Sequence, residues 1–154
     1  NNGVFLIIET LTDNKNRTAS EIRTILNKNG GVLGETGSAS FNFDKIGEVK
    51  YDSQNISKEK FFDFSIDKNA LDVIEEGPYI ISTCNPENFS KFRDDLELEF
   101  GEPKKSELIW KAKNPIKLEP DIEKKVLSFI DLLEENDDIQ RVFSNINLNQ
   151  NLEE

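Results

Sequence analysis

A pair of glycines directly after a helix-like segment is the feature that most constrains the fold of this chain. From Thr18 to Leu26 apolar side chains recur at helical spacing, and Gly30 and Gly31 follow. Because glycine adopts the left-handed backbone conformation without steric cost, the pair predicts that the helix ends there and the chain reverses. Thr18 and Glu21 have the spacing of a capping box, which predicts where the same helix begins.

Apolar patterns on both sides of this helix predict strands. Residues 4–8 form a continuous apolar run, which is typical of a strand buried on both faces. Residues 38–43 alternate, with Phe41 and Phe43 on one face, as expected of a half-buried strand. The N-terminal part of the chain is therefore predicted to have the order βαβ.

The C-terminal part of the chain repeats this order. A short strand is predicted at 116–118, a helix opens at Pro120, and a strand follows at 138–143. Joined, the two ends of the chain would complete one βαββαβ unit.

The middle of the chain has its own βαββαβ pattern. Strands are predicted at 47–51, 71–74, 79–83 and 107–112, with helices after the N-cap candidates Ser57 and Asn85. We therefore expect an α+β fold of two ferredoxin-like βαββαβ sandwiches, one inserted into the central connection of the other. The discontinuous α+β domain would comprise residues 1–46 and 113–154, and the inserted α+β domain residues 47–112.

Charge and composition limit the partners that suit this chain. Its net charge is −11 over 154 residues, so its surface repels phosphate and the chain alone should bind nucleic acid weakly. No apolar run approaches the roughly 20 residues of a membrane span, so no membrane partner is expected. The single Cys84 fits a reducing compartment. Because the chain lacks Met and runs directly into a strand, we expect that an N-terminal segment precedes it.

The sequence lacks the residue types on which most catalytic sites depend. The chain has no His, which removes the commonest general base and His-containing metal sites. The glycines follow a helix instead of leading into one, so they do not form a phosphate-binding loop. The acidic run 134–138 lacks the spacing of a calcium loop. We therefore expect no catalytic residue, no metal and no cofactor, and a protein that is not an enzyme.

The turn before the first helix, with the helix itself, is the most basic stretch of this acidic chain. A structural interpretation is strong here, because Asn and Asp favour turns and exposed Arg and Lys are ordinary helix residues. The alternative is a surface that contacts RNA phosphate or an acidic protein. The candidate partner or nucleic-acid-binding residues are Asn14, Lys15, Arg17, Arg23 and Lys28.

Three separated blocks, 11–18, 28–44 and 130–145, resemble the YebC family in the order that the family has them. The resemblance implies three domains, of which this chain would lack the first, a small basic helical one. It also implies a non-enzymatic role in gene expression. Family members are described as DNA-binding transcriptional regulators, and a mitochondrial relative as a translational activator of cytochrome c oxidase. The structural residues of its glycine-rich signature would be Thr18, Glu21, Gly30, Gly31, Gly34 and Gly37.

Between these roles, the sequence favours a ribosome-associated translational activator. An acidic body with one basic loop suits docking among ribosomal proteins and RNA better than gripping duplex DNA, which needs many phosphate contacts. The expected partner is the ribosome or RNA, bound by the intact protein, and the alternative is a DNA-binding transcriptional regulator. The expected location is the cytoplasm, or alternatively the mitochondrion or another organelle matrix.

Overall fold

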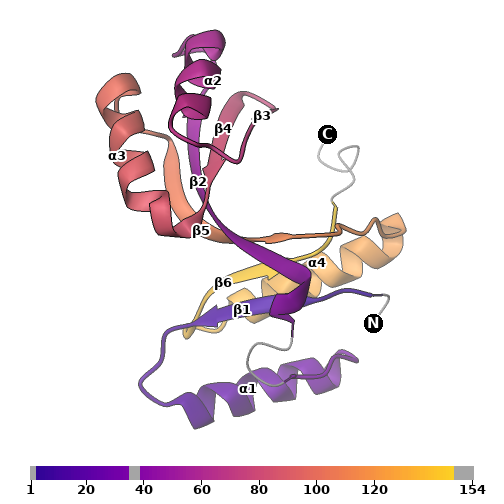
Figure 1. Cartoon of the computed structure of the whole chain (residues 1–154). Helices are drawn as coiled ribbons and strands as arrows, with labels where there is room; N and C mark the ends of the chain where they lie inside the picture. The colour runs from indigo at the N-terminus through magenta and orange to yellow at the C-terminus, as the bar shows by residue number, and fades with distance from the viewer. Residues whose placement is uncertain (1–2, 35–38, 148–154) are drawn as a thin grey trace. The chain divides into compact units, whose positions relative to one another are not determined.

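The chain divides into two compact units, one of them discontinuous. The computed structural model describes residues 3–34 and 39–147. One unit comprises Asn1–Asp44 and Lys111–Glu154, and the other comprises Lys45–Trp110. The chain passes between the units within strands β2 (Phe43–Asp52) and β5 (Lys105–Ala112) (Figure 1). In the structure the units divide after Asp44 and after Trp110. The boundaries predicted from the sequence, after residues 46 and 112, each lie two positions later.

The inserted unit has the ferredoxin-like arrangement expected for it. Between β2 and β5 lie α2 (Lys58–Asp67), β3 (Asp72–Glu76), β4 (Tyr79–Cys84) and α3 (Phe89–Phe100). The sheet has the order β3-β4-β2-β5, and β4 pairs antiparallel with both β2 and β3. This is the strand order of a βαββαβ sandwich. Helices α2 and α3 cover one face of the sheet (Figure 1).

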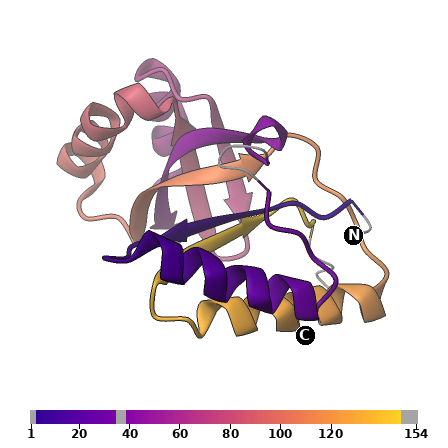
Figure 2. The same cartoon turned by 90° about the horizontal axis from the view of Figure 1, so that it is seen from below.

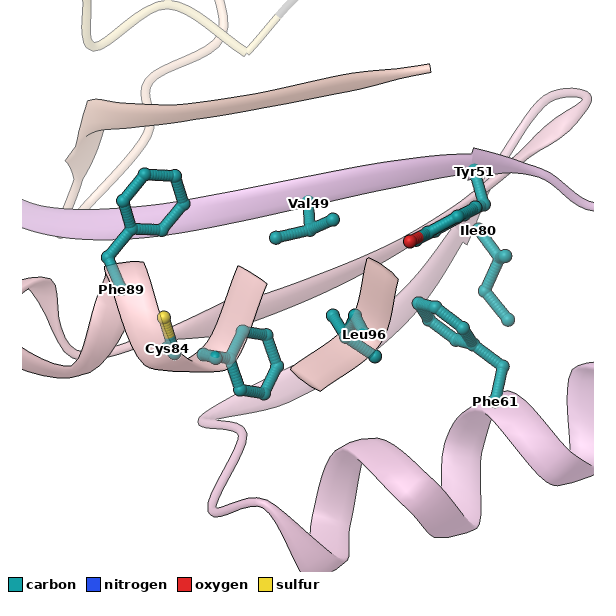
Figure 3. Packing of buried hydrophobic residues seen from close by; sticks show 8 residues of the cluster. Val49, Tyr51, Phe61, Ile80, Cys84, Phe89 and Leu96 are labelled. Atoms are coloured by element: carbon teal, nitrogen blue, oxygen red, sulfur yellow. The ribbon is translucent and has the colours of Figure 1, made fainter. Parts of the chain in front are cut away.

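The core of this unit lies between the sheet and its two helices. Strands β2 and β4 turn alternate side chains inward, and α2 and α3 meet them with aromatic and aliphatic residues (Figure 3). The buried members are Val49, Tyr51, Phe61, Ile80, Cys84, Phe89, Phe92 and Leu96. The predicted start and end of α2 are confirmed, whereas the helix predicted to follow Asn85 is preceded by a 3₁₀ turn, Pro86–Asn88, and α3 starts at Phe89. Ser57 accepts from the Lys60 N–H, and Asn69 follows α2 with a φ of 67°.

The discontinuous unit is built from both ends of the chain. Strand β1 (Leu6–Thr10) pairs antiparallel with β6 (Ile139–Ser144), and helices α1 (Lys15–Lys28) and α4 (Pro120–Glu134) lie next to this pair (Figure 2). Residues from three of these elements form its buried core: Ile22, Leu26, Leu133 and Ile139.

The predicted strand at 38–43 is wrong. Ser38 lies outside the described residues, Ser40–Asn42 form a 3₁₀ turn, and Phe43 begins β2. Within the turn the Asn42 N–H bonds to the Ala39 carbonyl at 3.1 Å, so this backbone satisfies itself without a neighbouring strand. Phe41 is 82% exposed, whereas Phe43 is buried, so the two do not share a face.

The predicted strand at 116–118 is reduced to one isolated parallel bridge, between Ile116 and Ile146. As a result, the sheet of the discontinuous unit has two strands in the described part of the chain, where the sequence predicted four. The α+β class is confirmed. The ferredoxin-like strand order holds for the inserted unit and differs in the discontinuous one.

Candidate partner-binding surface

Helix α1 begins about one turn earlier than the sequence predicts. Asn14 is its N-cap, with a φ of −141° and a side-chain oxygen that accepts a hydrogen bond from the Arg17 N–H at 3.0 Å. Thr18 therefore lies inside the helix and is only 2% exposed. The predicted capping box of Thr18 and Glu21 is wrong, because Asn14 already caps the free N–H groups of the first turn.

Thr18 instead belongs to a polar junction that we define as Thr12, Arg17, Thr18 and Asp138. The Thr18 hydroxyl donates to Asp138 Oδ2 at 2.7 Å, and Arg17 donates to the same oxygen at 3.2 Å. The hydroxyl oxygens of Thr12 and Thr18 are 2.8 Å apart. The Thr18 hydrogen bond and the Arg17 charge hold the pKa of Asp138 below its ordinary value. The junction ties the start of α1 to the start of β6.

The acidic run at 134–138 completes this connection. Asn136 donates to Glu21 Oε1 at 3.3 Å, and the Asp138 N–H donates to Asn136 Oδ1 at 2.9 Å. The Leu11 N–H donates to the Asp138 carbonyl at 2.9 Å. Two segments that the sequence analysis interpreted separately are thus one structural assembly. Among the residues that the structure describes, no three His, Cys, Asp or Glu side chains are grouped to hold a metal ion.

Arg17 is the predicted site residue most strongly engaged within the chain. Its guanidinium lies 3.2 Å from Asp138 and 3.6 Å from Asp13. The hydrogen bond to Asp138, with the charge of that carboxylate, raises the pKa of Arg17 above its ordinary value. A partner phosphate would therefore compete with two carboxylates for Arg17. Asn14 is likewise engaged, since its side chain caps α1.

The other three predicted basic residues are placed differently. Lys15, Arg23 and Lys28 are exposed, and no ion pair within 3–34 and 39–147 involves them. Ile22 and Leu26 face the core, and Lys15 lies two turns before Ile22 on the same side of the helix, at its exposed start. Arg23 and Lys28 point away from this core side. We define the α1 outer face by these two residues and the exposed uncharged polar residues beside them: Asn16, Ser20, Arg23, Thr24, Asn27 and Lys28. It carries two positive charges on a chain of net charge −11.

The glycines after α1 shape the end of this surface. Gly30 has a φ of 80°, and the Gly31 N–H donates to the Leu26 carbonyl at 2.8 Å, which is the Schellman ending of a helix. The predicted helix end is confirmed. Gly34 is exposed and has no regular secondary structure, and Gly37 lies outside the described residues.

Sequence reasoning missed Asp138 and Thr12 as residues that position this surface. A signal was present, because Asp138 immediately precedes a strand and Thr12 follows soon after another. Pairing Thr10 with Ile139 in an antiparallel ladder brings these two strand ends together.

Comparison with known proteins agrees with this architecture. The family described as "TACO1/YebC second and third domain" matches residues 1–146. The structure is similar to the crystal structure of a conserved hypothetical protein from Aquifex aeolicus, with a TM-score of 0.84 and 30% sequence identity. The match covers 96% of this chain and 61% of the Aquifex chain, so this chain spans less than two thirds of that relative.

No helix in the described ranges is both long enough and apolar enough to cross a membrane. The match over residues 1–146 covers both units of the structure, and the chain therefore belongs to the TACO1/YebC family.

Proposed function

We propose that this chain is part of a non-enzymatic regulator of gene expression that acts as a ribosome-associated translational activator. The α1 outer face would contact ribosomal RNA phosphates or an acidic protein segment. The observation that supports the proposal most directly is the exposure of Lys15, Arg23 and Lys28, which have no carboxylate partner among the described residues, beside an Arg17 that has two. Free cations can neutralise partner phosphates without first breaking an internal pair.

The number of free cations favours RNA within a ribosome over duplex DNA. Two charges on the α1 outer face, with Lys15 at the start of the helix, give few phosphate contacts, and the rest of an acidic chain repels a DNA backbone. A ribosome also offers protein surfaces, many of them basic, to the acidic remainder of the chain. The polar side chains of the outer face, such as Asn16 and Asn27, can add hydrogen bonds to sugar or phosphate oxygens.

The alternative is a DNA-binding transcriptional regulator that uses the same face. It predicts binding to duplex DNA with a preference for one sequence, which a purely electrostatic contact does not give. Under either role no chemical step is proposed. The sequence has no His, and the Cys84 thiol is buried, with a pKa raised by that burial to about 11. A ribosomal role would place the protein in the cytoplasm or in an organelle matrix.

Co-sedimentation with purified ribosomes across a salt series tests the proposal, with duplex DNA added as competitor. The double variant Arg23→Ala, Lys28→Ala should pellet less and lower the slope of log affinity against log salt by about 1.5, as loss of two phosphate contacts requires. The matched control Lys124→Ala, Lys125→Ala removes the same charge from exposed positions of α4 and should behave like the unchanged protein. If DNA strips the protein from ribosomes, the transcriptional alternative replaces the proposal.

A further inference from the structure

The outer edge of the inserted sheet has unpaired backbone groups. Strand β3 is the last strand on its side of the sheet (Figure 1). A two-residue turn, Gly77-Pro78, joins it to β4, and Gly77 has the positive φ, 57°, that such a turn needs. In a hairpin of this kind the closing pair, here Glu76 with Tyr79, is hydrogen-bonded.

Because hydrogen-bonded pairs alternate along an antiparallel ladder, the direction of each backbone group in β3 follows from this turn. Asp72, Ile74 and Glu76 bond to β4, while Val73 and Glu75 direct their N–H and C=O groups away from the sheet. One contact agrees with this assignment. The Val73 N–H donates to the side-chain Oδ1 of Asp72 at 2.8 Å instead of to β4. At this edge the Val73 N–H is therefore bonded to the Asp72 carboxylate, which an incoming strand can displace.

An apolar stripe lies beside this edge. Lys58, Phe62 and Ile66 are spaced four residues apart, so they line one side of α2. Lys58 shows where that side faces, because its Nζ lies 2.6 Å from Glu75 Oε1 on β3. Phe62 is 50% exposed and Ile66 48%, and Leu71, just before β3, is 53% exposed. Three large apolar side chains thus flank the outer edge of β3.

The charges along this edge identify the kind of segment that would fit. Asp72, Glu75 and Glu76 are exposed on β3, and Asp63 and Asp67 are exposed on α2. We infer that β3 is a docking edge for an extended, basic segment of a partner protein, which adds to the sheet as a further strand. Its apolar side chains would pack on Phe62, Ile66 and Leu71, and a Lys or Arg would draw the Asp72 carboxylate off the Val73 N–H.

The inference is independent of the α1 outer face, so its test can fail without affecting the proposed function. The probe is a fluorescein-labelled octapeptide of alternating lysine and valine, titrated into the whole chain and followed by fluorescence anisotropy. A peptide with glutamate in place of lysine is the charge control. Binding of the lysine peptide, and no binding of the glutamate peptide, is the expected result.

Two matched pairs of variants locate the binding. Glu75→Pro removes the outward N–H together with the carboxylate and should retain the fold, whereas Glu75→Ala removes the carboxylate alone and retains the N–H. We expect Glu75→Pro to weaken binding at least about tenfold and Glu75→Ala only about threefold. Phe62→Ser with Ile66→Ser should also cost about tenfold, whereas Leu98→Ser, at an 88% exposed position of α3, should change little.

Circular dichroism melting identifies any variant that fails to fold, and the Phe62 and Ile66 substitutions test the edge even if Glu75→Pro unfolds. The inference is overturned if the lysine peptide does not bind. It is also overturned if folded Glu75→Pro and the double serine variant bind like the unchanged chain, because the contact is then a diffuse charge attraction. An equal loss in Leu98→Ser would place the binding elsewhere.

Discussion

The hydroxyl of Thr18 donates to the carboxylate of Asp138 at 2.7 Å, across 120 positions of the sequence. Thr18 is buried in the first turns of α1, and Asp138 directly precedes β6. Arg17 shares the same carboxylate oxygen. The Thr18–Asp138 contact holds the N-terminal end of α1, the helix whose outer face we propose as the partner surface. Asp138 also pairs with Arg17, so the charge of this arginine is engaged within the chain.

Replacing Thr18 with valine, which has nearly the same shape, should destabilise the chain by about 1–3 kcal/mol, because a buried hydrogen-bonded hydroxyl is lost. Urea unfolding followed by circular dichroism measures this change. Thr24→Val is the matched control, since within the described residues the Thr24 hydroxyl bonds to the Ser20 carbonyl alone, on the exposed side of the same helix. Equal losses in the two variants would show that the junction adds nothing.

The stability of the chain should depend on Asp138 in acid. Its pKa is lower in the folded state than in the unfolded state, so its ionised form stabilises the fold above the unfolded pKa of about 3.9. That contribution is lost as the pH falls below this value through the folded pKa. The stability of Asp138→Asn, measured by urea unfolding from pH 6 to pH 2, should therefore fall less steeply than that of the unchanged chain. Parallel curves would contradict the assignment.

Gly47 should not tolerate a side chain. A Cβ at this position of β2 would clash with the Phe89 ring and lie 2.9 Å from Cys84 Sγ. We expect Gly47→Ala to cost about 1–3 kcal/mol, the usual penalty for overpacking. Combining it with Phe89→Leu should recover part of that loss in a double-mutant cycle, because the clash is with the ring. Additive losses would indicate that the ring is not the obstacle.

Cys84 should be inert in the folded chain. Its side chain is 1% exposed, and burial raises the pKa of its thiol to about 11, so little thiolate forms at neutral pH. Iodoacetamide at pH 7.5 should label the chain only in denaturant, as mass spectrometry would show. Labelling of the native chain at the rate of a free thiol would mean that the core of the inserted unit opens readily.

Local signals predicted the parts of the fold that local physics determines. Gly30 ends α1 and Asn69 follows α2, each with the positive φ that such an ending requires. Ser57 caps α2, because a cap needs only its own first turn. The βαββαβ order of the inserted unit follows from short periodic runs that lie close together in sequence.

The predictions were wrong where contacts between residues far apart in the sequence determine the local structure. Thr18 matched a capping box, but its hydroxyl is used by Asp138, far away along the chain. Phe41 fits an alternating strand, yet it is exposed. For the candidate site, sequence reasoning identified all the cations of α1, but not that Arg17 is paired while Lys15, Arg23 and Lys28 have no ion pair in the described part of the chain. That distinction depends on the β1–β6 pairing.

The most direct test of the central claim is site-specific photo-crosslinking from the α1 outer face. A photoreactive amino acid replaces Asn27 on this face or, as control, Lys124 on α4, and the chain is irradiated with purified ribosomes and an equal mass of duplex DNA. The account predicts ribosomal RNA or protein adducts from position 27, lost when Arg23 and Lys28 are changed to alanine, and few from position 124. Adducts mainly to DNA, or equal yields from both positions, would contradict it.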